Sequence, residues 1–268
     1  MKRGQCAYDE ASVADLPGAN EWETSGALAH QRDGHMPEGL QFSNQLLASL
    51  PPKDLALILP GLQRVKLPLR RRLESANKRV DHVYFPESGF ASVVASNGTL
   101  DSIEVGLIGR EGMTGLTIVL RVDQSPHDTF IQLAGDGYRL AAPALKGALE
   151  RSLGLQSLLL RYAYAFGIQA SQTALANGRY KIEERLARWL LMAQDRVDGD
   201  QLTLTHEFLG TMLGVRRSGV SVALQLLELR GMVRVRRGAI VIFDRDALED
   251  AANGAYGVAE KELKRVTA

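Results

Sequence analysis

The sequence predicts an α+β fold in which a block of short strands precedes a long helical stretch and a C-terminal unit of two helices and a β-ribbon. Between residues 65 and 141, short apolar runs alternate with turn residues, which is typical of strands. Residues 144–176 carry apolar side chains at helical spacing. Residues 202–244 then read as a helix, a glycine turn, a second helix and two strands.

The composition is that of an ordinary globular protein large enough for two modest domains: 268 residues, of which 45% are hydrophobic and 24% charged. The net charge is +1, so any affinity for nucleic acid must come from local clusters of charge. Cys6 is the only cysteine, which excludes an internal disulfide and any site that needs several thiolates from one chain. No apolar run approaches the roughly 20 residues that span a bilayer, so we expect a cytoplasmic protein without membrane association.

The first part of the chain carries few structural signals. Residues 1–38 mix small, charged and histidine residues without a period, which predicts a flexible N-terminal extension. We expect Ser43 to cap a first helix over Asn44–Leu50, because serine favours that position. Pro51-Pro52 should end this helix, and a second short helix is expected over Lys53–Leu59.

Residues 39–142 are predicted to form a β-roll or jelly-roll domain. Asn97-Gly98 lies between two stretches of alternating apolar residues, which is a strong hairpin signal. A barrel or jelly roll is the usual way to close so many short strands. The predicted strands are Val80–Phe85, Phe90–Ala95, Leu100–Ile108, Phe130–Leu133 and Tyr138–Ala141.

A single long helix is predicted over residues 143–177, opened by Pro143. Its apolar stripe becomes small toward the C-terminal half, which would let a second helix approach closely. Two interpretations remain open: a dimer seam, or packing of the stripe on the chain's own β-domain. Asn177-Gly178 should interrupt the helix, and another is expected from Tyr180 to about Arg196. The stripe consists of Leu149, Leu153, Leu160, Ala163, Gly167, Ala170 and Ala174.

Residues 178–250 carry the most specific signal. Thr205 is a good N-cap for a helix over His206–Leu213, and Gly214 supplies a tight turn before a second helix over Arg217–Leu229. Two strands follow, Met232–Arg236 and Ala239–Phe243. This order is that of a winged helix-turn-helix. Residues 251–268 are left as a C-terminal tail.

Basic and short polar residues are expected on the exposed side of this unit. Residues 202–238 hold six arginines against two glutamates, a local excess of +4 in a nearly neutral chain. Exposed arginines alone are more often a solvated surface, but their place on a second helix and a ribbon tip favours contacts with DNA bases and phosphates. The predicted DNA-binding residues are Thr205, Arg216, Arg217, Ser218, Ser221, Gln225, Arg236 and Arg237.

Over roughly residues 40–250 the chain resembles the CRP/FNR family of transcription regulators. The family's helix-turn-helix and wing are resembled by the stretch LTHEFLGTMLGVRRSGVSVALQLLELRGMVRVRRGAIVIFD. An early strand pair of its β-roll is resembled by the stretch HVYFPESGFASVV. The resemblance implies a β-roll sensor domain, a long dimerisation helix, and a homodimer that binds double-stranded DNA at a pseudo-palindromic site. RNA polymerase is a further candidate partner.

The departures from the family concern the effector. Cyclic-nucleotide-binding members carry a Gly-Glu pair that holds the ribose, whereas this chain has Gly109-Arg110 there, with Glu111 displaced by one. Those members also carry an Arg-Ser pair that holds the cyclic phosphate, whereas this chain has Pro126-His127. Without the phosphate arginine we expect no cyclic AMP dependence. No cofactor is predicted and the effector is unknown, although His82 and His127 leave haem ligation open. The candidate effector pocket consists of Gly109, Arg110, Glu111, His127 and Ser171.

The recognition helix departs as well. Family members that read the best-known half-site place Arg-Glu and a further Arg along it, whereas this chain has Arg217, Ser218 and Val222 at those positions. The target sequence should therefore differ. In mechanism, the β-domain is expected to bias the orientation of the winged helices about a hinge near residues 177–180.

Two alternatives to an effector-dependent regulator stay open: a regulator that needs no ligand, and a protein-interaction module that uses the winged helix as a scaffold. An enzyme is not expected, because the sequence shows no nucleophile and base in a recognised motif, no metal-ligand spacing and no cofactor loop. Carboxylates such as Glu87 and Glu104 are interpreted as solvated groups at strand edges and turns.

Overall fold

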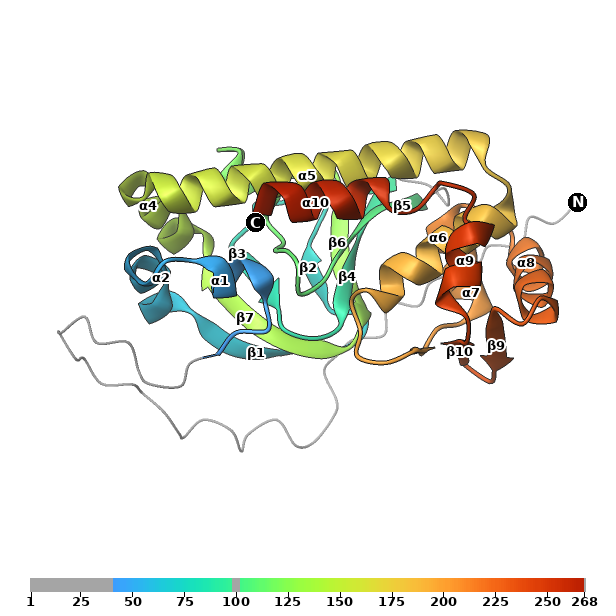
Figure 1. Ribbon diagram of the computed structural model, residues 1–268. Helices are drawn as coiled ribbons and strands as arrows, with labels where there is room; N and C mark the ends of the chain where they lie inside the picture. Colours follow the sequence, from blue (N-terminus) through green and yellow to red (C-terminus); the bar gives the residue numbers. More distant parts are fainter. Residues whose placement is uncertain (1–40, 98–101, 268) are drawn as a thin grey trace, which may run out of the picture. The chain divides into compact units, whose positions relative to one another are not determined.

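The computed structural model describes residues 41–97 and 102–267. The predicted N-terminal extension, Cys6 and Gly98 of the expected hairpin turn lie outside these residues. Within them the predicted α+β architecture is confirmed, with a β-rich domain, a long helix and a helix-turn-helix unit in chain order (Figure 1). No helix in the described ranges is both long and apolar enough to cross a membrane.

Two short helices open the described chain, α1 (Gln45–Ser49) and α2 (Pro52–Ile58), followed by a 3₁₀ turn over Leu59–Gly61. The cap of α1 is Asn44 and not Ser43 as predicted: the Asn44 side chain accepts a hydrogen bond from the Leu47 amide at 3.1 Å. The Glu87 carboxylate accepts hydrogen bonds from the amides of Ser43 and Asn44, which places Ser43 one residue before the cap. Glu87 is therefore not merely a solvated turn residue.

The β-domain contains two antiparallel sheets, ordered β1-β7-β3 and β2-β6-β4-β5. All five predicted strands are present, and in the predicted hairpin Ser96 of β4 pairs with Ser102 of β5. Strands β1 and β2 and the short helix α3 (Leu116–Val119) were not predicted; β1 and β2 are edge strands, whose residues can be largely polar. The strands are β1 (Gln63–Leu67), β2 (Arg72–Glu74), β3 (His82–Pro86), β4 (Phe90–Ser96), β5 (Ser102–Ile108), β6 (Asp128–Leu133) and β7 (Gly135–Ala141).

The predicted long helix is two helices, α4 (Ala142–Arg151) and α5 (Leu153–Arg179). Ser152 separates them in an extended conformation, because its hydroxyl donates to Asp54 at 2.7 Å and accepts from the Leu155 amide at 3.0 Å. The expected break at Asn177-Gly178 is wrong: α5 continues to Arg179. Asparagine and glycine weaken a helix by at most about 1 kcal/mol each, which packing elsewhere can offset.

The apolar stripe predicted on this helix faces away from the β-domain. Leu153 is 82% exposed and Leu160 is 41% exposed, while Gly167 and Ala174 are exposed as well. The side of α5 that packs on the β-domain consists of other residues, among them Leu155, Leu158, Leu159, Tyr162, Ala165 and Gln169. Leu153, Leu160, Gly167 and Ala174 therefore do not pack on the chain's own β-domain, whereas Ala163 and Ala170 are half-buried and Leu149 is buried in α4.

The C-terminal part begins with α6 (Ile182–Gln194) after two extended residues, Tyr180 and Lys181. The predicted helix-turn-helix and wing follow as α7 (His206–Leu213), α8 (Arg217–Leu229), β9 (Val233–Arg236) and β10 (Ala239–Ile242). A short strand, β8 (Gln201–Leu202), adds a third strand to the wing sheet, in the order β8-β10-β9.

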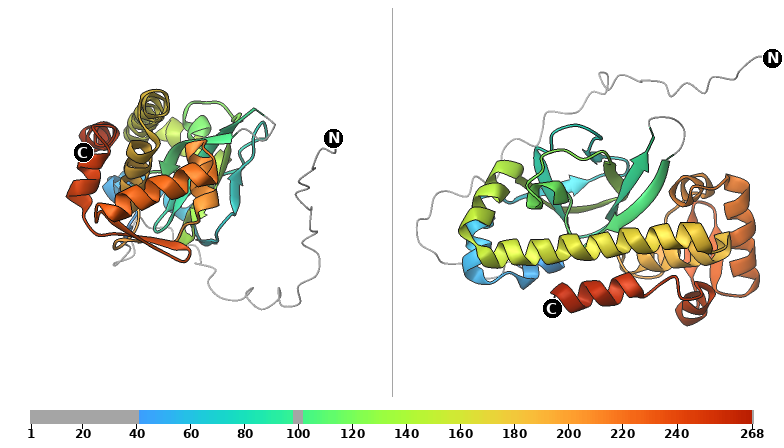
Figure 2. Two further views of the ribbon diagram at one scale, coloured as in Figure 1. Left: turned by 90° about the vertical axis from the view of Figure 1, so that its right-hand side faces the viewer. Right: turned by 90° about the horizontal axis from the view of Figure 1, so that it is seen from above.

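The segment expected as a tail is helical. After α9 (Arg245–Ala251), helix α10 (Val258–Thr267) runs beside α5 (Figure 2). The Arg161 guanidinium of α5 donates to the Val266 carbonyl at 2.6 Å, and Ala259 and Val266 are buried. The C-terminus therefore packs back on the long helix.

One hydrophobic core continues from the β-domain into the C-terminal domain. Phe90 and Leu107 of the β-domain belong to the same cluster as Trp189 of α6 and Leu213 of α7. The rings of Phe90 and Trp189 meet edge to face, with centroids 6.3 Å apart. This shared core positions the helix-turn-helix unit.

Candidate nucleic-acid interface

Local capping sets the geometry of the two helices. The Thr205 hydroxyl accepts from the Phe208 amide at 3.3 Å, so its oxygen caps α7. Gly214 ends α7 with φ 62°, in the left-handed region that glycine adopts without a steric cost. Gly210 allows the close turn into α8, since a Cβ there would lie 2.9 Å from the Val215 carbonyl oxygen.

Helix α8 has a buried side and an exposed side. Val220, Ala223, Leu224 and Leu227 are buried in the core. Among the residues predicted to contact DNA, Arg216 at the N-cap and Arg217, Ser218 and Gln225 on the helix are exposed. The first turn of α8 therefore presents guanidinium and hydroxyl groups to solvent.

Ser221 is more constrained than predicted. Its hydroxyl donates to the Arg217 carbonyl at 3.1 Å and lies 3.0 Å from Nδ1 of His206. Ser221 thus joins the starts of α7 and α8, and its hydroxyl is engaged within the domain.

The wing is held against α8. The Glu228 carboxylate of α8 accepts from the Val235 amide of β9 at 2.8 Å. Arg236 pairs with Ala239, and the turn between them places Gly238 at φ 74°. Arg237 therefore lies at the ribbon tip.

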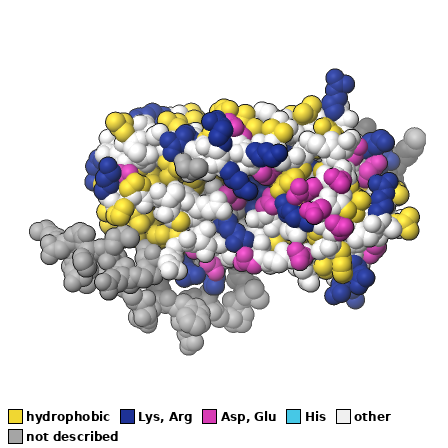
Figure 3. All heavy atoms as spheres, in the orientation of Figure 1, with side chains coloured by type: hydrophobic (Ala, Val, Ile, Leu, Met, Phe, Trp, Pro, Cys, Tyr) yellow, Lys and Arg dark blue, Asp and Glu magenta, His cyan; other side chains and the backbone are white. Residues whose placement is uncertain are grey.

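The four arginines predicted to contact DNA have free guanidinium groups. Arg216, Arg217, Arg236 and Arg237 are exposed, and none forms a hydrogen bond or ion pair through its side chain within the described ranges. Arg234 differs, because its guanidinium stacks on the Phe243 ring at 4.7 Å. Figure 3 shows basic side chains gathered over the β9–β10 ribbon. Such free guanidinium groups can pair with phosphates and with guanine.

The five predicted effector residues do not form one pocket. Arg110 forms an ion pair with Asp198 at 2.8 Å, and Glu111 forms one with Arg196 at 2.7 Å, with both Glu111 and Arg196 side chains nearly buried. The Gly109 amide donates to the same Glu111 carboxylate at 3.1 Å. Arg110 and Glu111 therefore bind the segment that follows α6, and Gly109 supports Glu111.

The two remaining effector candidates lie elsewhere. The Ser171 hydroxyl is exposed on α5 and donates to the Gly167 carbonyl at 2.9 Å. His127 precedes β6, and its Nδ1 is buried without a partner in the described chain. No contact among the described residues joins either of them to Gly109, Arg110 or Glu111.

Little space remains between β5 and α5. The Gln169 amide accepts from the Leu107 amide at 2.6 Å and donates to the Leu107 carbonyl at 3.2 Å, as a strand neighbour would. The cavity beside it, lined among others by Glu111, Tyr162 and Arg196, holds about 20 Å³. That is room for about one water molecule.

A buried carboxylate joins the two domains, which the sequence interpretation missed. Glu104 of β5 is fully buried and not a solvated strand-edge group: the Trp189 indole donates to it at 2.7 Å and the Ser92 hydroxyl at 2.5 Å. Burial raises the pKa of Glu104 to about 7, while the two hydrogen bonds and the positive charges of Arg196 and Arg188 oppose that rise. No local sequence signal indicates this burial, because the alternation of Glu104 with apolar residues predicts a solvent-facing position on the strand.

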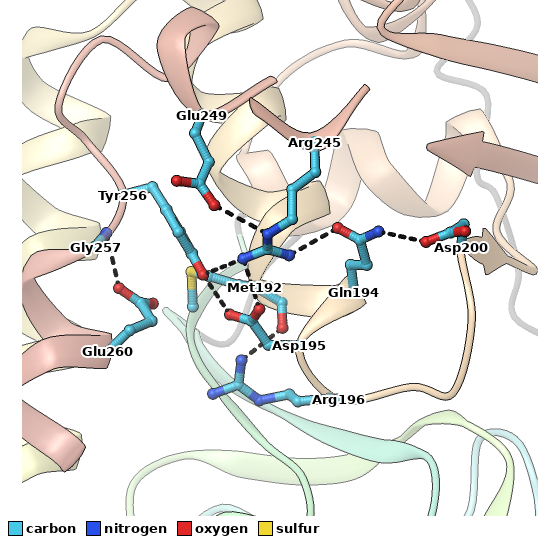
Figure 4. A network of polar contacts seen from close by, with 10 residues as sticks. All are labelled: Met192, Gln194, Asp195, Arg196, Asp200, Arg245, Glu249, Tyr256, Gly257 and Glu260. Atoms are coloured by element: carbon cyan, nitrogen blue, oxygen red, sulfur yellow. Dashed lines mark hydrogen bonds and ion pairs between the residues drawn. The ribbon is translucent and has the colours of Figure 1, made fainter. Parts of the chain in front are cut away.

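A second unpredicted network surrounds Arg245 at the start of α9 (Figure 4). Its guanidinium donates to Gln194 at 2.7 Å, to Asp195 at 2.9 Å and to the Tyr256 hydroxyl at 2.7 Å. The Tyr256 hydroxyl in turn donates to Asp195 at 2.7 Å, and burial together with Asp195 raises its pKa above the usual range. This network fixes the loop that leads into α10.

Comparison with known proteins identifies the C-terminal unit. Residues 184–251 match the family model described as the Crp-like helix-turn-helix domain. No curated protein sequence matches the chain significantly.

Solved structures share the fold of the chain. A regulator of the CRP/FNR family from Eubacterium rectale is 19% identical, with a TM-score of 0.62 over 78% of this chain and 98% of that one. FixK2 from Bradyrhizobium japonicum is 16% identical, with a TM-score of 0.62 over 71% and 96%. The regulator CLP from Xanthomonas campestris, which responds to c-di-GMP, is 16% identical, with a TM-score of 0.55 over 72% and 99%.

Proposed function

We propose that this protein, which has the fold of the CRP/FNR transcription regulators and carries their helix-turn-helix domain, is a cytoplasmic homodimer that binds a pseudo-palindromic DNA site sequence-specifically. The observation that carries the proposal is the set of four free guanidinium groups, at Arg216 and Arg217 of α8 and at Arg236 and Arg237 of the wing. An exposed helix start and a ribbon tip with free positive charge suit simultaneous contact with a major groove and the flanking phosphates.

In this proposal the exposed residues in the N-terminal half of α8 read bases. Arg217 lies in the first turn, where a guanidinium can pair with both major-groove acceptors of guanine. Arg236 and Arg237 bind phosphates, which positions the domain without reading the sequence. Ser221 and Thr205 act mainly on the protein itself, since their hydroxyls are engaged with Arg217, His206 and the α7 backbone.

The exposed side of α5 supports the homodimer. Leu153, Leu160, Gly167 and Ala174 recur every seven residues on that side, which is the spacing of a two-helix seam. Small residues in its second half would let a partner helix approach closely. A twofold axis along this seam would present one α8 to each half of a symmetric DNA site.

The packing between β5 and α5 favours a regulator that does not depend on cyclic AMP. The cavity of about 20 Å³ is far smaller than the roughly 300 Å³ or more typical of ligand pockets. Arg110 and Glu111 are instead bound to Asp198 and Arg196, which follow α6, and the Gly109 amide donates to Glu111. An effector of another class, or none, would then set the population that binds DNA, and RNA polymerase would be the partner if binding activates transcription.

Selection of bound duplexes from a random-sequence pool at physiological salt tests the proposal. We expect a twofold-symmetric site, and we expect Arg217→Ala to weaken its binding by about 1–3 kcal/mol through loss of a base-reading pair. Absence of enrichment, with weak salt-sensitive binding that Arg217→Ala leaves unchanged, would contradict the proposal and favour the protein-interaction module.

A further inference from the structure

One exposed row of α8 contains a valine that the core does not use. Ser218, Val222, Gln225 and Leu229 follow one another at spacings of four, three and four residues, so they share one side of the helix. All four are exposed, and Val222 is 56% exposed. The buried side of α8 is complete without it, because Val220, Ala223, Leu224 and Leu227 fill the core.

Helix stability does not explain this valine. A β-branched side chain loses rotamer freedom in a helix, so alanine would favour the helix more. Val222 also lies between two polar neighbours of the row, Ser218 and Gln225, one turn away on either side. An exposed apolar group that the core does not use, and that lies between Ser218 and Gln225, suits a surface that is itself locally apolar.

In the major groove of DNA the thymine C5-methyl is such a group, since the other base edges there present hydrogen-bond donors and acceptors. We propose that Val222 is a specificity-determining residue that contacts the C5-methyl group of a thymine in each half-site. This inference rests on the proposed function, in which α8 enters the major groove.

The place of Val222 on α8 limits which thymine it can reach. It follows Arg217 by five residues, which corresponds to about 7.5 Å along the helix axis. Base pairs are stacked about 3.4 Å apart, so the thymine should lie about two base pairs from the guanine that Arg217 reads. A polar variant of this position would lose the contact, because a thymine methyl cannot form a hydrogen bond.

Leu229 provides a matched control. It belongs to the same row and is 86% exposed, but it is the last residue of α8. In helix-turn-helix proteins the N-terminal residues of the recognition helix contact the bases. Leu229→Ala should therefore leave DNA binding unchanged.

The test removes the thymine C5-methyl group from the DNA and the two Cγ methyl groups of Val222 from the protein. After the operator has been selected, each thymine of a half-site is replaced in turn by deoxyuridine, which lacks only the C5-methyl. The affinities of the full-length wild type, Val222→Ala and Leu229→Ala are then measured for every duplex. Circular dichroism and the urea midpoint check that both variants fold as the wild type does.

We expect one thymine per half-site at which deoxyuridine weakens wild-type binding by about fourfold, the equivalent of about 0.8 kcal/mol for one buried methyl group. Val222→Ala should bind the thymine operator more weakly and should not distinguish deoxyuridine at that position. Leu229→Ala should behave as the wild type does. The coupling between the two deletions isolates the contact.

Two results would overturn the inference and leave the proposed function standing. In the first, the wild type binds every deoxyuridine duplex as tightly as the thymine operator, while Arg217→Ala still binds more weakly. In the second, deoxyuridine weakens the binding of Val222→Ala as much as that of the wild type. If the pool yields no operator, the premise is lost and the inference fails together with the proposed function. The two failures are therefore distinguishable.

Discussion

The indole of Trp189 in α6 donates a hydrogen bond at 2.7 Å to the buried carboxylate of Glu104 in β5, 85 residues earlier in the chain. The Ser92 hydroxyl binds the other carboxylate oxygen at 2.5 Å. This arrangement places an ionisable group inside the core that the β-domain shares with the helix-turn-helix unit. The stability of that junction therefore depends on pH and on the donors around Glu104.

The pH dependence of unfolding should change in Glu104→Gln. Burial raises the folded-state pKa of Glu104 from 4.5 to about 7, so folding favours its protonated form. Below about pH 4.5 the carboxyl is protonated in both the folded and the unfolded chain, and it leaves the free energy of unfolding unchanged. Between about pH 4.5 and 7 that free energy falls as pH rises, and above about pH 7 it is lower by about 3 kcal/mol. Urea unfolding at pH 5 and pH 8 should show Glu104→Gln gaining relative to the wild type at the higher pH. An equal difference in the free energy of unfolding between Glu104→Gln and the wild type at both pH values would contradict the raised pKa of Glu104.

Breaking the Glu111–Arg196 ion pair should destabilise the fold strongly. Glu111→Gln leaves the buried Arg196 guanidinium without its counter-charge, which typically costs about 3–5 kcal/mol. Arg110→Ala is the matched control, because its partner Asp198 is largely exposed and such pairs contribute at most about 1 kcal/mol. Thermal or urea unfolding measures both. Equal losses in the two variants would show that burial of the pair does not matter.

The oligomeric state should respond to a charge on the exposed side of α5. Leu160→Glu places carboxylates opposite each other in the proposed seam, and we expect a monomer in sedimentation equilibrium where the wild type is a dimer. Leu229→Glu, at the end of α8, should leave the dimer intact. A dimer that survives Leu160→Glu would place the interface elsewhere.

The wing and the recognition helix should differ in how they depend on salt and sequence. Arg237→Ala removes one proposed phosphate contact from each protomer of the dimer, so the slope of log affinity against log salt should fall by about 2, and all DNA sequences should lose affinity alike. Lys66→Ala, on the exposed edge strand β1, should change neither quantity. Loss of affinity for the selected operator alone would instead mean that Arg237 reads bases.

Calorimetric titration with cyclic AMP should give no tight binding. Glu111, one of the candidate effector residues, is occupied by Arg196, and Gln169 fills the space between β5 and α5 by binding the Leu107 backbone. A stoichiometric, high-affinity isotherm would overturn this expectation and would require α5 to move away from β5.

The order of elements and the helix-turn-helix could be predicted from the sequence because their signals act between near neighbours. Thr205 caps a helix that begins at the next residue, Gly214 takes the left-handed turn, and Gly238 closes the wing. The exposed and buried sides of α8 likewise follow from a repeat within 13 residues. The free guanidinium groups of α8 and the wing lie where those patterns predicted them.

What the tertiary structure decided depends on partners far apart in the chain. Ser152 divides the long helix because its hydroxyl donates a hydrogen bond to Asp54, 98 residues earlier in the chain. Helix α10 docks on α5, and Glu104 becomes a buried link between domains because Trp189 and Ser92 surround it. Sequence alone determined the five central strands, the helix-turn-helix unit with its wing and the basic surface, since hydrogen bonds and periodicity there are local. Only folding decided which of their side chains are enclosed, because burial depends on residues that meet across the whole chain.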